Sequence, residues 1–424
     1  MDLLQKIKQN IKIPNKKLEN QNLNFDNAEV NQTDSSEIEC EIKLKDKIIK
    51  RVSIVAIILS ALSMLYLFLV YTNIPAIANL RTMYIETAMS TMTHQWLATA
   101  FLPDNVVAEV MRNVHQQFED NMVAESQLPK ESEPAQIIPD EKPGEGNAYL
   151  EFASLFPEIN LMTLPDDIYF NNLMSLQIKD IADKGIETYA GDTVWAIDVP
   201  NKLIIVKVTG DGYEGKLAII KDSSQIFLSH NTLNSRGQTV TEQCEANDAV
   251  LGINASGFQD YNGSGAGNIP VGLIISESQI MNPAVNGQYQ IVGFDAEHNL
   301  RVGYGLDINN LRDAAQFYPI IVLNGENATD GSYGMGIQPR TAIGQTSDKT
   351  TLMLIIDGRQ THSLGTTVSE CANILLRYGC WTAMNMDGGS SSSMTYMGEM
   401  ITKTSSPMKT GRYLPDAWLV RKAK

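Results

Sequence analysis

The chain has 424 residues, 43% of them hydrophobic, and a formal net charge of -16. This length and apolar content can supply one large domain with a substantial core, together with appended segments. The negative charge argues against a protein that binds nucleic acid or an anionic surface through bulk electrostatic attraction, so we expect no nucleic-acid partner.

The N-terminal part of the chain combines a polar tail with an apolar stretch. The first 42 residues are polar with few aromatic side chains, which predicts a disordered tail over residues 1–51. Five basic residues at its end precede Val52–Tyr71, and this stretch is long enough to cross a bilayer at a rise of about 1.5 Å per residue. We therefore expect a transmembrane helix at 52–72. The basic residues predict a cytoplasmic tail and an extracellular remainder.

Residues 73–126 are predicted to form a helical stalk. Between Leu80 and Ser126 there is no glycine and one proline, so we expect two helices broken at Pro103, with Asp104 capping the second. Four prolines among acidic residues then predict an exposed linker over 127–147. A fragment that begins near the following domain, 148–424, is therefore expected to fold without the stalk.

Short β-rich runs separated by turn signals start at residue 193, where the core of this domain is expected to begin. They predict an α+β fold built on a mixed β-sheet. The expected strands are 194–199, 203–208, 217–221, 249–253, 271–275, 291–294, 300–304 and 319–323. The last is followed by Glu326, which is either an additional acid of the site or a solvated turn residue.

The stretch Thr351–Met386 predicts a βαβ unit. A buried strand is expected at 351–356, and a helix then starts at the capping box formed by Thr367 and Glu370. A second apolar strand is expected at 381–386. The two strands of such a unit are parallel and joined by a right-handed crossover.

Asp357 and Asp387 directly follow these two strands, at the ends where α/β layers place their ligands. We expect the two carboxylates to share one rim. Gly388, Gly389 and Ser391 would bring backbone amides and a hydroxyl close to phosphate or sugar oxygens. The alternative is that each aspartate-glycine pair is only a turn and the serines are only a loop.

Two arginines near these motifs, Arg340 and Arg359, are expected to clamp an anion through charge-assisted hydrogen bonds. We expect no cofactor and no metal. The four cysteines have no CxxC spacing, and the sequence contains no histidine cluster for a transition metal.

Several segments resemble, in order, the motifs of the phosphodiester glycosidase domain family. They are Ile253–Phe258, Pro270–Leu273, Pro339–Gly344, Ile356–Arg359 and Asn385–Ser391. The resemblance covers about residues 202–421. Ala255 and Ser256 replace two customary glycines, and Ser390 stands where a third glycine is common.

This resemblance implies a membrane-anchored extracellular hydrolase that cleaves a sugar-1-phosphodiester in a cell-surface or exported glycan. Such a reaction develops an oxocarbenium-like carbon and a phosphomonoester leaving group, so it requires a carboxylate near the sugar and positive charge near the phosphate. Asp387 and Asp357 would be the carboxylates, and the two arginines would hold the phosphate. The side chains that would orient sugar hydroxyls or water are Asn254, Asn385 and Ser391.

Two other functions use the same residues. A non-catalytic phosphoglycan-binding module would hold sugar hydroxyls with the same carboxylates and amides. A metal-dependent phosphodiesterase would use Asp357, Asp387 and Glu326 as oxygen ligands for a hard cation. Release of sugar distinguishes the hydrolase from the binding module, and sensitivity to chelators identifies the metal enzyme.

Overall fold

The structure is a computed structural model. It describes residues 32–91, 94–122, 125–129, 147–165, 173–233, 235–260, 265–287, 289–329 and 335–423. Contacts between residues divide the chain into two compact units, Met1–Phe68 and Leu69–Lys424. The described residues form seven α-helices and three β-sheets, which confirms the expected α+β class.

The long helix α2, Gln32–Tyr71, contains the apolar stretch predicted to span a membrane. Within the described residues, Cys40–Tyr71 is the one helix that is long and apolar enough to cross a bilayer, judged by length and composition. The helix begins twenty residues before the expected span, so residues 32–51 are helical where the sequence predicts a disordered tail. The sequence here contains good helix formers, and Glu41 pairs with Lys45 one turn away at 2.8 Å. Residues 1–31 of the predicted tail lie outside the described part.

Three helices follow: α3 (Pro75–Met89), α4 (Trp96–Thr99) and α5 (Asp104–Met122). The break at Pro103 is confirmed, and a second break after α3 was not expected from the sequence. The three helices pack around a small apolar core made up of Val70, Ile85, Ala88, Ala98, Val106, Val107 and Val110.

The start of the predicted linker is hydrogen-bonded to the domain, and the side chains of Gln127 and Leu128 are exposed as predicted. The backbone amide of Ser126 donates to the carbonyl of Val302 at 2.8 Å. The amide of Gln127 donates to Asn324 Oδ1 at 2.8 Å, and the Gln127 carbonyl accepts from Trp381 Nε1 at 2.8 Å. Residues 130–146 of the predicted linker lie outside the described part of the chain.

The largest sheet has nine strands. In spatial order they are β1 (Gln177–Lys179), β2 (Thr193–Asp198), β3 (Leu203–Gly210), β4 (Tyr213–Ile220), β15 (Thr351–Ile356), β14 (Arg340–Thr346), β16 (Cys380–Met386), β12 (Ile320–Leu323) and β13 (Glu326–Asn327). Neighbouring strands in this sheet pair antiparallel. The strands β15 and β16 are both antiparallel to β14, which lies between them, so they are parallel to each other, as the βαβ pattern predicts.

Two five-stranded sheets cover one face of the large sheet. One has the order β10 (Leu300–Gly303), β9 (Gln290–Asp295), β11 (Leu311–Phe317), β7 (Ile274–Ser276) and β8 (Gln279–Asn282). The other has the order β18 (Glu399–Met400), β17 (Met394–Tyr396), β6 (Ala249–Asn254), β19 (Asp416–Arg421) and β5 (Ile226–His230). Side chains from all three sheets form one buried cluster, which includes Ile205, Phe294, Met353 and Trp418.

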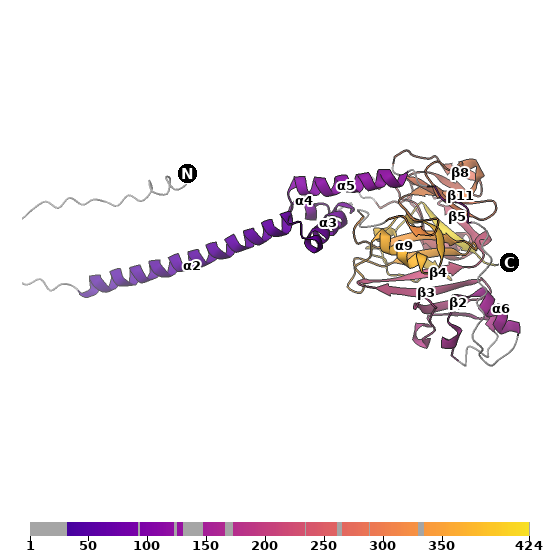
Figure 1. Cartoon of the computed structure of the whole chain (residues 1–424), viewed down its shortest axis with the longest axis horizontal. Coiled ribbons are helices and arrows are strands. Elements are labelled where there is room, and N and C mark those ends of the chain that lie inside the picture. Colours follow the sequence, from indigo (N-terminus) through magenta and orange to yellow (C-terminus); the bar gives the residue numbers. More distant parts are fainter. Residues whose placement is uncertain are drawn as a thin grey trace, which may run out of the picture. The chain divides into compact units, whose positions relative to one another are not determined.

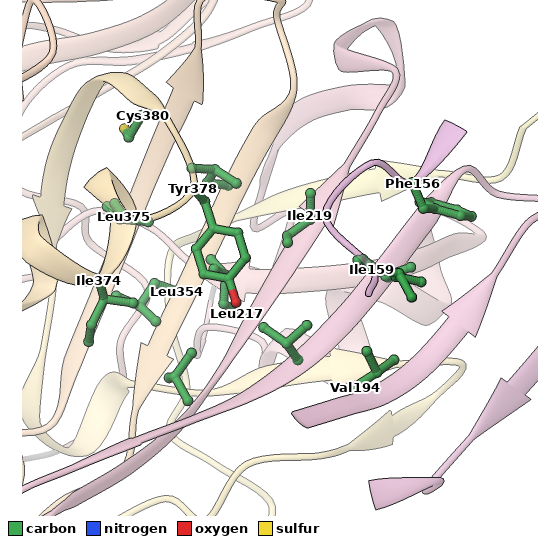
Figure 2. Packing of buried hydrophobic residues seen from close by; sticks show 14 of the residues in the cluster. Phe156, Ile159, Val194, Leu217, Ile219, Leu354, Ile374, Leu375, Tyr378 and Cys380 are labelled. Atoms are coloured by element: carbon green, nitrogen blue, oxygen red, sulfur yellow. The ribbon is translucent and has the colours of Figure 1, made fainter. Parts of the chain in front are cut away.

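Helices pack on the nine-stranded sheet and on the sheet that contains β6, and α6 (Asn147–Leu155) and α9 (Val368–Leu376) are labelled in Figure 1. Both lie on the other face of the large sheet, and α8 (Val240–Ala246) packs against the sheet that contains β6. In Figure 2, Ile374 and Leu375 of α9 gather with Leu354 of β15 and Leu217 of β4. The α9 helix begins at Thr367, whose hydroxyl accepts from the amide of Glu370, as the capping pattern predicts.

Candidate functional site

The register of the central strands brings the two sequence motifs to one edge of the sheet. In the pairing, Ile356 at the end of β15 lies opposite Arg340, and Met386 at the end of β16 lies opposite Thr341. Both strands therefore end at the start of β14. Strands two positions apart lie about 10 Å from each other. Asp357 and Asp387 follow these ends, so the backbone places them at a common rim.

Asp387 lies in a polar, partly buried environment. Its amide donates to the carbonyl of Ala255 at 3.1 Å, and its carboxylate accepts from Ser391 and from the amide of Gly388. Burial raises the pKa of this carboxyl to about 6, although Arg412 and Arg359 oppose the shift. A carboxyl with this pKa can exchange a proton near neutral pH, as a general acid or base requires.

The loop after β16 is shaped by two glycines. Gly389 has a positive φ of 61°, and its amide donates to the carbonyl of Pro339 at 2.9 Å. A side-chain carbon at Gly388 would lie 2.8 Å from the Pro339 carbonyl oxygen, so this position also requires glycine. The two glycines hold Asp387 close to the start of β14.

Arg359 lies beside this loop. A carbon placed on Gly389 would be 3.3 Å from Arg359 Nη2 and 3.4 Å from Nη1, so the guanidinium faces the glycine directly. The charge of Asp387 acts on Arg359, and Nε of the arginine donates to Gln338 Oε1 at 3.0 Å. Arg359 is exposed at this edge, which leaves it accessible to an anionic ligand.

A second cation of the site, Arg412, was missed in the sequence. Its Nη1 donates to Ser390 Oγ at 3.2 Å, and its Nη2 pairs with Asp260 Oδ2 at 2.6 Å. Its guanidinium lies 4.6 Å from the ring centroid of Phe258. Arg412 belongs to a connection outside the recognised motifs, so no local pattern marked it, and only the pairing of β19 with β6 brings it near Asp387.

Asp416 is a second carboxyl that the sequence did not indicate. It is fully buried at the start of β19, where its carboxylate accepts from the amide of Ser256 at 2.7 Å and from the hydroxyl of Ser256. Burial raises its pKa to about 7, and the negative charge of Asp387 adds to the shift. The two carboxyls therefore interact electrostatically. Ser256, one of the replacements for the customary glycines, supplies both donors to Asp416.

The two asparagines of the prediction are buried supports. Asn254 Nδ2 donates to the carbonyl of Asp387 at 2.6 Å, and its Oδ1 accepts from Thr341 Oγ1 at 2.8 Å and from the amide of Ser393 at 3.2 Å. Asn385 Nδ2 donates to the carbonyl of Tyr318 at 2.8 Å. The structure thus directs Asn254 to the protein backbone around Asp387, whereas the sequence predicts a contact with sugar or water.

Arg340 also differs from its expected role. It is 2% exposed, its Nε donates to the carbonyl of Thr366 at 2.9 Å, and its Nη2 donates to the carbonyls of Met335 and Gly336. Burial lowers its pKa to about 10. A side chain held by three carbonyls beneath the surface connects segments of the fold, and this position does not match the phosphate clamp expected from the sequence.

Asp357 has its own set of partners. Its Oδ1 accepts from the amide of Lys403 at 3.0 Å, and its Oδ2 lies 3.4 Å from Nε2 of His362, a residue that the sequence analysis did not select. Burial raises the pKa of Asp357, while the Lys403 amide and His362 oppose the shift. Thr404 then donates to the carbonyl of Ser390 at 3.1 Å, so residues 403 and 404 connect the two loops of the rim.

Glu326 lies at the other end of the sheet. It is exposed in β13, and the amide of neighbouring Gly325 donates to the carbonyl of Trp381 at 2.9 Å, next to the start of β16. Six residues of strand separate Trp381 from Asp387, which corresponds to about 20 Å. Glu326 therefore cannot complete a site with the two aspartates. Among the described residues, no group of three or more histidine, cysteine, aspartate or glutamate side chains could hold a metal ion.

Part of the chain is similar to known proteins. Residues 247–421 match the family model of phosphodiester glycosidases. The SPbeta prophage-derived uncharacterized protein YomE of Bacillus subtilis is 25% identical over 268 residues, which cover 58% of this chain and 38% of YomE. This chain thus matches well under half of the length of that relative.

Two solved structures resemble the fold in part. One is the zebrafish N-acetylglucosamine-1-phosphodiester alpha-N-acetylglucosaminidase catalytic domain auto-inhibited by its pro-peptide, with 16% identity, a TM-score of 0.43 and coverage of 52% of this chain and 82% of that one. The other is a putative exported protein from Burkholderia pseudomallei K96243, with 17% identity, a TM-score of 0.38 and coverage of 49% and 74%. At these TM-scores, the two likenesses support no conclusion about function. The match to the phosphodiester glycosidase model covers residues 247–421, and so includes β15 and β16 together with the loops that carry Asp357 and Asp387.

Proposed function

We propose that the protein hydrolyses the glycosidic bond of a sugar-1-phosphodiester at the rim formed by the ends of β15 and β16. The observation that carries this proposal is the position of Asp387, a carboxyl with a pKa near 6 that interacts with both Arg359 and Arg412. A carboxyl flanked by two cations is suited to a substrate that develops positive charge at a sugar carbon and negative charge on a phosphate.

In this proposal Asp387 acts at the anomeric carbon or on the attacking water, and Asp357 is the second carboxyl of the rim. Arg359 and Arg412 hold the phosphate. Gly388, Gly389 and Ser391 form the loop that positions Asp387 for the substrate, since their donors are bound to the Asp387 carboxylate and to the Pro339 carbonyl. The bond between the anomeric carbon and oxygen breaks, the water oxygen joins the carbon, and the released phosphate group takes a proton.

The protein is further proposed to be anchored by α2, with its N-terminus in the cytoplasm and its glycosidase domain outside the cell. The basic residues before the apolar stretch support this orientation. The substrate would then be a phosphodiester-linked glycan of the cell surface or an exported polysaccharide.

Hydrolysis in water enriched in oxygen-18 tests the reaction. The detergent-solubilised full chain is incubated with a panel of sugar-1-phosphate methyl esters, and the products are identified by mass spectrometry. We expect the heavy oxygen in the released sugar. Heavy oxygen in the phosphate, together with inhibition by a chelator, would instead identify the metal-dependent phosphodiesterase.

The Asp387→Asn variant tests the residue. Loss of a charge-stabilising or proton-transferring carboxylate should lower the rate by about 10²–10⁴. Asp183→Asn is a matched control, because that aspartate is exposed and far from the β16 loop in sequence. Binding of phosphoglycans without release of any sugar would favour the non-catalytic binding module.

A further inference from the structure

A cavity of about 570 Å³ lies between the helices that follow α2 and the glycosidase domain. Its helical wall comes from α3, α4, Thr91 and His94, and its other wall comes from the segments around β14 and β15. The lining residues are Leu80, Met83, Tyr84, Thr87, Ala88, Thr91, His94, Leu97, Ile337, Gln338, Arg359 and Leu364. This volume is within the range of about 300–1,000 Å³ that is typical of small-molecule sites.

Most of this lining is apolar, and part of it is open to solvent. Leu80 is 68% exposed, Leu364 is 61% exposed and Tyr84 is 43% exposed. Trp96 and Phe101, whose ring centroids are 6.2 Å apart, are also exposed on the same group of helices. Exposed apolar side chains that gather around a cavity indicate an apolar ligand or a lipid surface.

The cavity and the proposed active site share one charged residue, Arg359. Arg359 lines the cavity, and its guanidinium also faces Gly389 in the loop of Asp387. Gln338 fixes this arrangement, because its Oε1 accepts from Arg359 and its Nε2 donates to the carbonyl of Thr87 at 2.9 Å. A phosphate bound at Arg359 would thus have the carboxylate loop on one side and the apolar cavity on the other.

The helical wall of the cavity is attached to the end of the candidate membrane span. Arg81 of α3 donates to the carbonyl of Leu69 at 3.1 Å and to that of Thr72 at 3.0 Å. Val70 is buried in the same cluster as Ile85 of α3. The cavity therefore begins within a few helical turns of the residues at which an apolar helix would leave a bilayer.

We propose that this cavity binds the hydrocarbon chain of a lipid alcohol, so that the substrate is a sugar joined through a phosphodiester to a lipid. This inference rests on the proposed function, because it identifies the second alcohol of the same phosphodiester. Hydrolysis breaks the bond between the anomeric carbon and oxygen and adds the oxygen of water to that carbon. The oxygen that joined the sugar to phosphorus stays on the phosphorus and takes a proton from the water, so the products are a free sugar and a lipid phosphate monoester.

A photoreactive product analogue tests this site without any need for turnover. The full chain in lipid nanodiscs is irradiated with dodecyl phosphate that carries a diazirine at the end of the alkyl chain. The labelled peptides are then identified by mass spectrometry. We expect labelling of residues that line the cavity on α3 and near residue 364, suppressed by unlabelled dodecyl phosphate but not by dodecanol or inorganic phosphate at the same concentration.

Variants at the open edge of the cavity sharpen the test. Leu80→Gln and Leu364→Gln replace exposed side chains, and each should weaken dodecyl phosphate binding roughly fivefold through lost apolar contact. Leu150→Gln is the matched control, because Leu150 is 60% exposed on α6 and does not line the cavity. Arg359→Ala should abolish the difference in affinity between dodecyl phosphate and dodecanol.

The possible outcomes separate this inference from the proposed function. Labelling confined to the apolar part of α2, or labelling that unlabelled dodecyl phosphate does not reduce, would overturn the lipid site. Equal binding by the Leu80 and Leu364 variants and the parent would also overturn it, even if methyl esters of sugar phosphates are hydrolysed. Competable labelling of the cavity in a protein that releases no sugar would support the lipid site and contradict the hydrolase.

Discussion

At the scale of single residues, two arginines affect the pKa of one carboxyl, that of Asp387. Burial raises the pKa of Asp387, and Arg412 and Arg359 lower it. Both arginines approach the same short loop, Arg359 across Gly389 and Arg412 at Ser390. The protonation state of Asp387 near neutral pH therefore depends on these two side chains.

Replacing Arg412 by alanine should raise the pKa of Asp387 above about 6, because it removes a positive charge that favours the ionised carboxylate. The inflection in the dependence of kcat/KM on pH should move to higher pH in the variant. The same measurement on Arg421→Ala is the control, since Arg421 pairs with Glu277 at 2.6 Å at the far end of β19. An unchanged inflection in Arg412→Ala would show that another group controls the profile.

The sequence predicted the strands that end before Asp357 and Asp387, but it did not predict the residues that approach them from other parts of the chain. Asp357, Asp387 and the glycines follow buried strands of regular pattern, so their common edge could be derived from the βαβ unit. Asp416 begins β19 of a different sheet and Arg412 lies in the connection before it, and their approach depends on long-range strand pairing that no local pattern encodes. The positive charge of Arg340 predicts a contact with a phosphate, but the sequence does not indicate that this side chain is buried in the folded protein.

At the scale of elements, the contact between α3 and the domain is the feature that the sequence did not predict. A stretch rich in helix formers and followed by prolines is typical of a stalk and a linker. The structure instead buries Glu86 of α3, whose carboxylate accepts from the amide of Gly336. Thr87 Oγ1 accepts from the amide of Ile337 at 3.0 Å. Side-chain hydrogen bonds to a distant loop cannot be derived from helical periodicity.

Glu86 should make the stability of the protein depend on pH. Burial raises its pKa from 4.5 to about 7 in the folded protein. Between pH 4.5 and pH 7 the folded state keeps a proton on Glu86 that the unfolded state has lost. The contribution of Glu86 to the free energy of unfolding is therefore greatest at low pH and falls as the pH rises toward 7, by at most on the order of 3 kcal/mol.

Glu86→Gln keeps the acceptor for Gly336 without the ionisable group. The variant should melt at a higher temperature than the parent at pH 8 and at a similar temperature at pH 4.5, as measured by thermal denaturation of the solubilised full chain. A constant difference between variant and parent over this pH range would contradict the assignment.

The same contacts change the expectation for truncated fragments. A fragment that starts at Asn73 retains α3 and residues 125–127, whereas a fragment that starts at Tyr149 lacks all their hydrogen bonds to the domain. We therefore expect the shorter fragment to melt at a lower temperature, contrary to the prediction from the linker composition. Equal melting temperatures would show that the helices add no stability.

At the scale of the whole molecule, the proposed membrane orientation determines which end of the chain is accessible from outside the cell. The basic residues before Val52 predict that the N-terminus lies in the cytoplasm. On intact cells, external protease should remove a tag fused after Lys424 and should leave a tag before Met1 intact. Cell lysis is the control that makes both tags accessible, and a protected C-terminal tag on intact cells would contradict the orientation.

Asn254 has a consequence for how the domain unfolds. One side chain of β6 holds the carbonyl of Asp387, the hydroxyl of Thr341 in β14 and the amide of Ser393, so it joins two sheets at the rim. Groups that are connected in this way cannot separate by fraying of a single loop, and local opening of the rim should require an opening of the sheets themselves. The amide of Asp387, which is bound to the Ala255 carbonyl, should then exchange its hydrogen with solvent as slowly as the amides in the centre of β14.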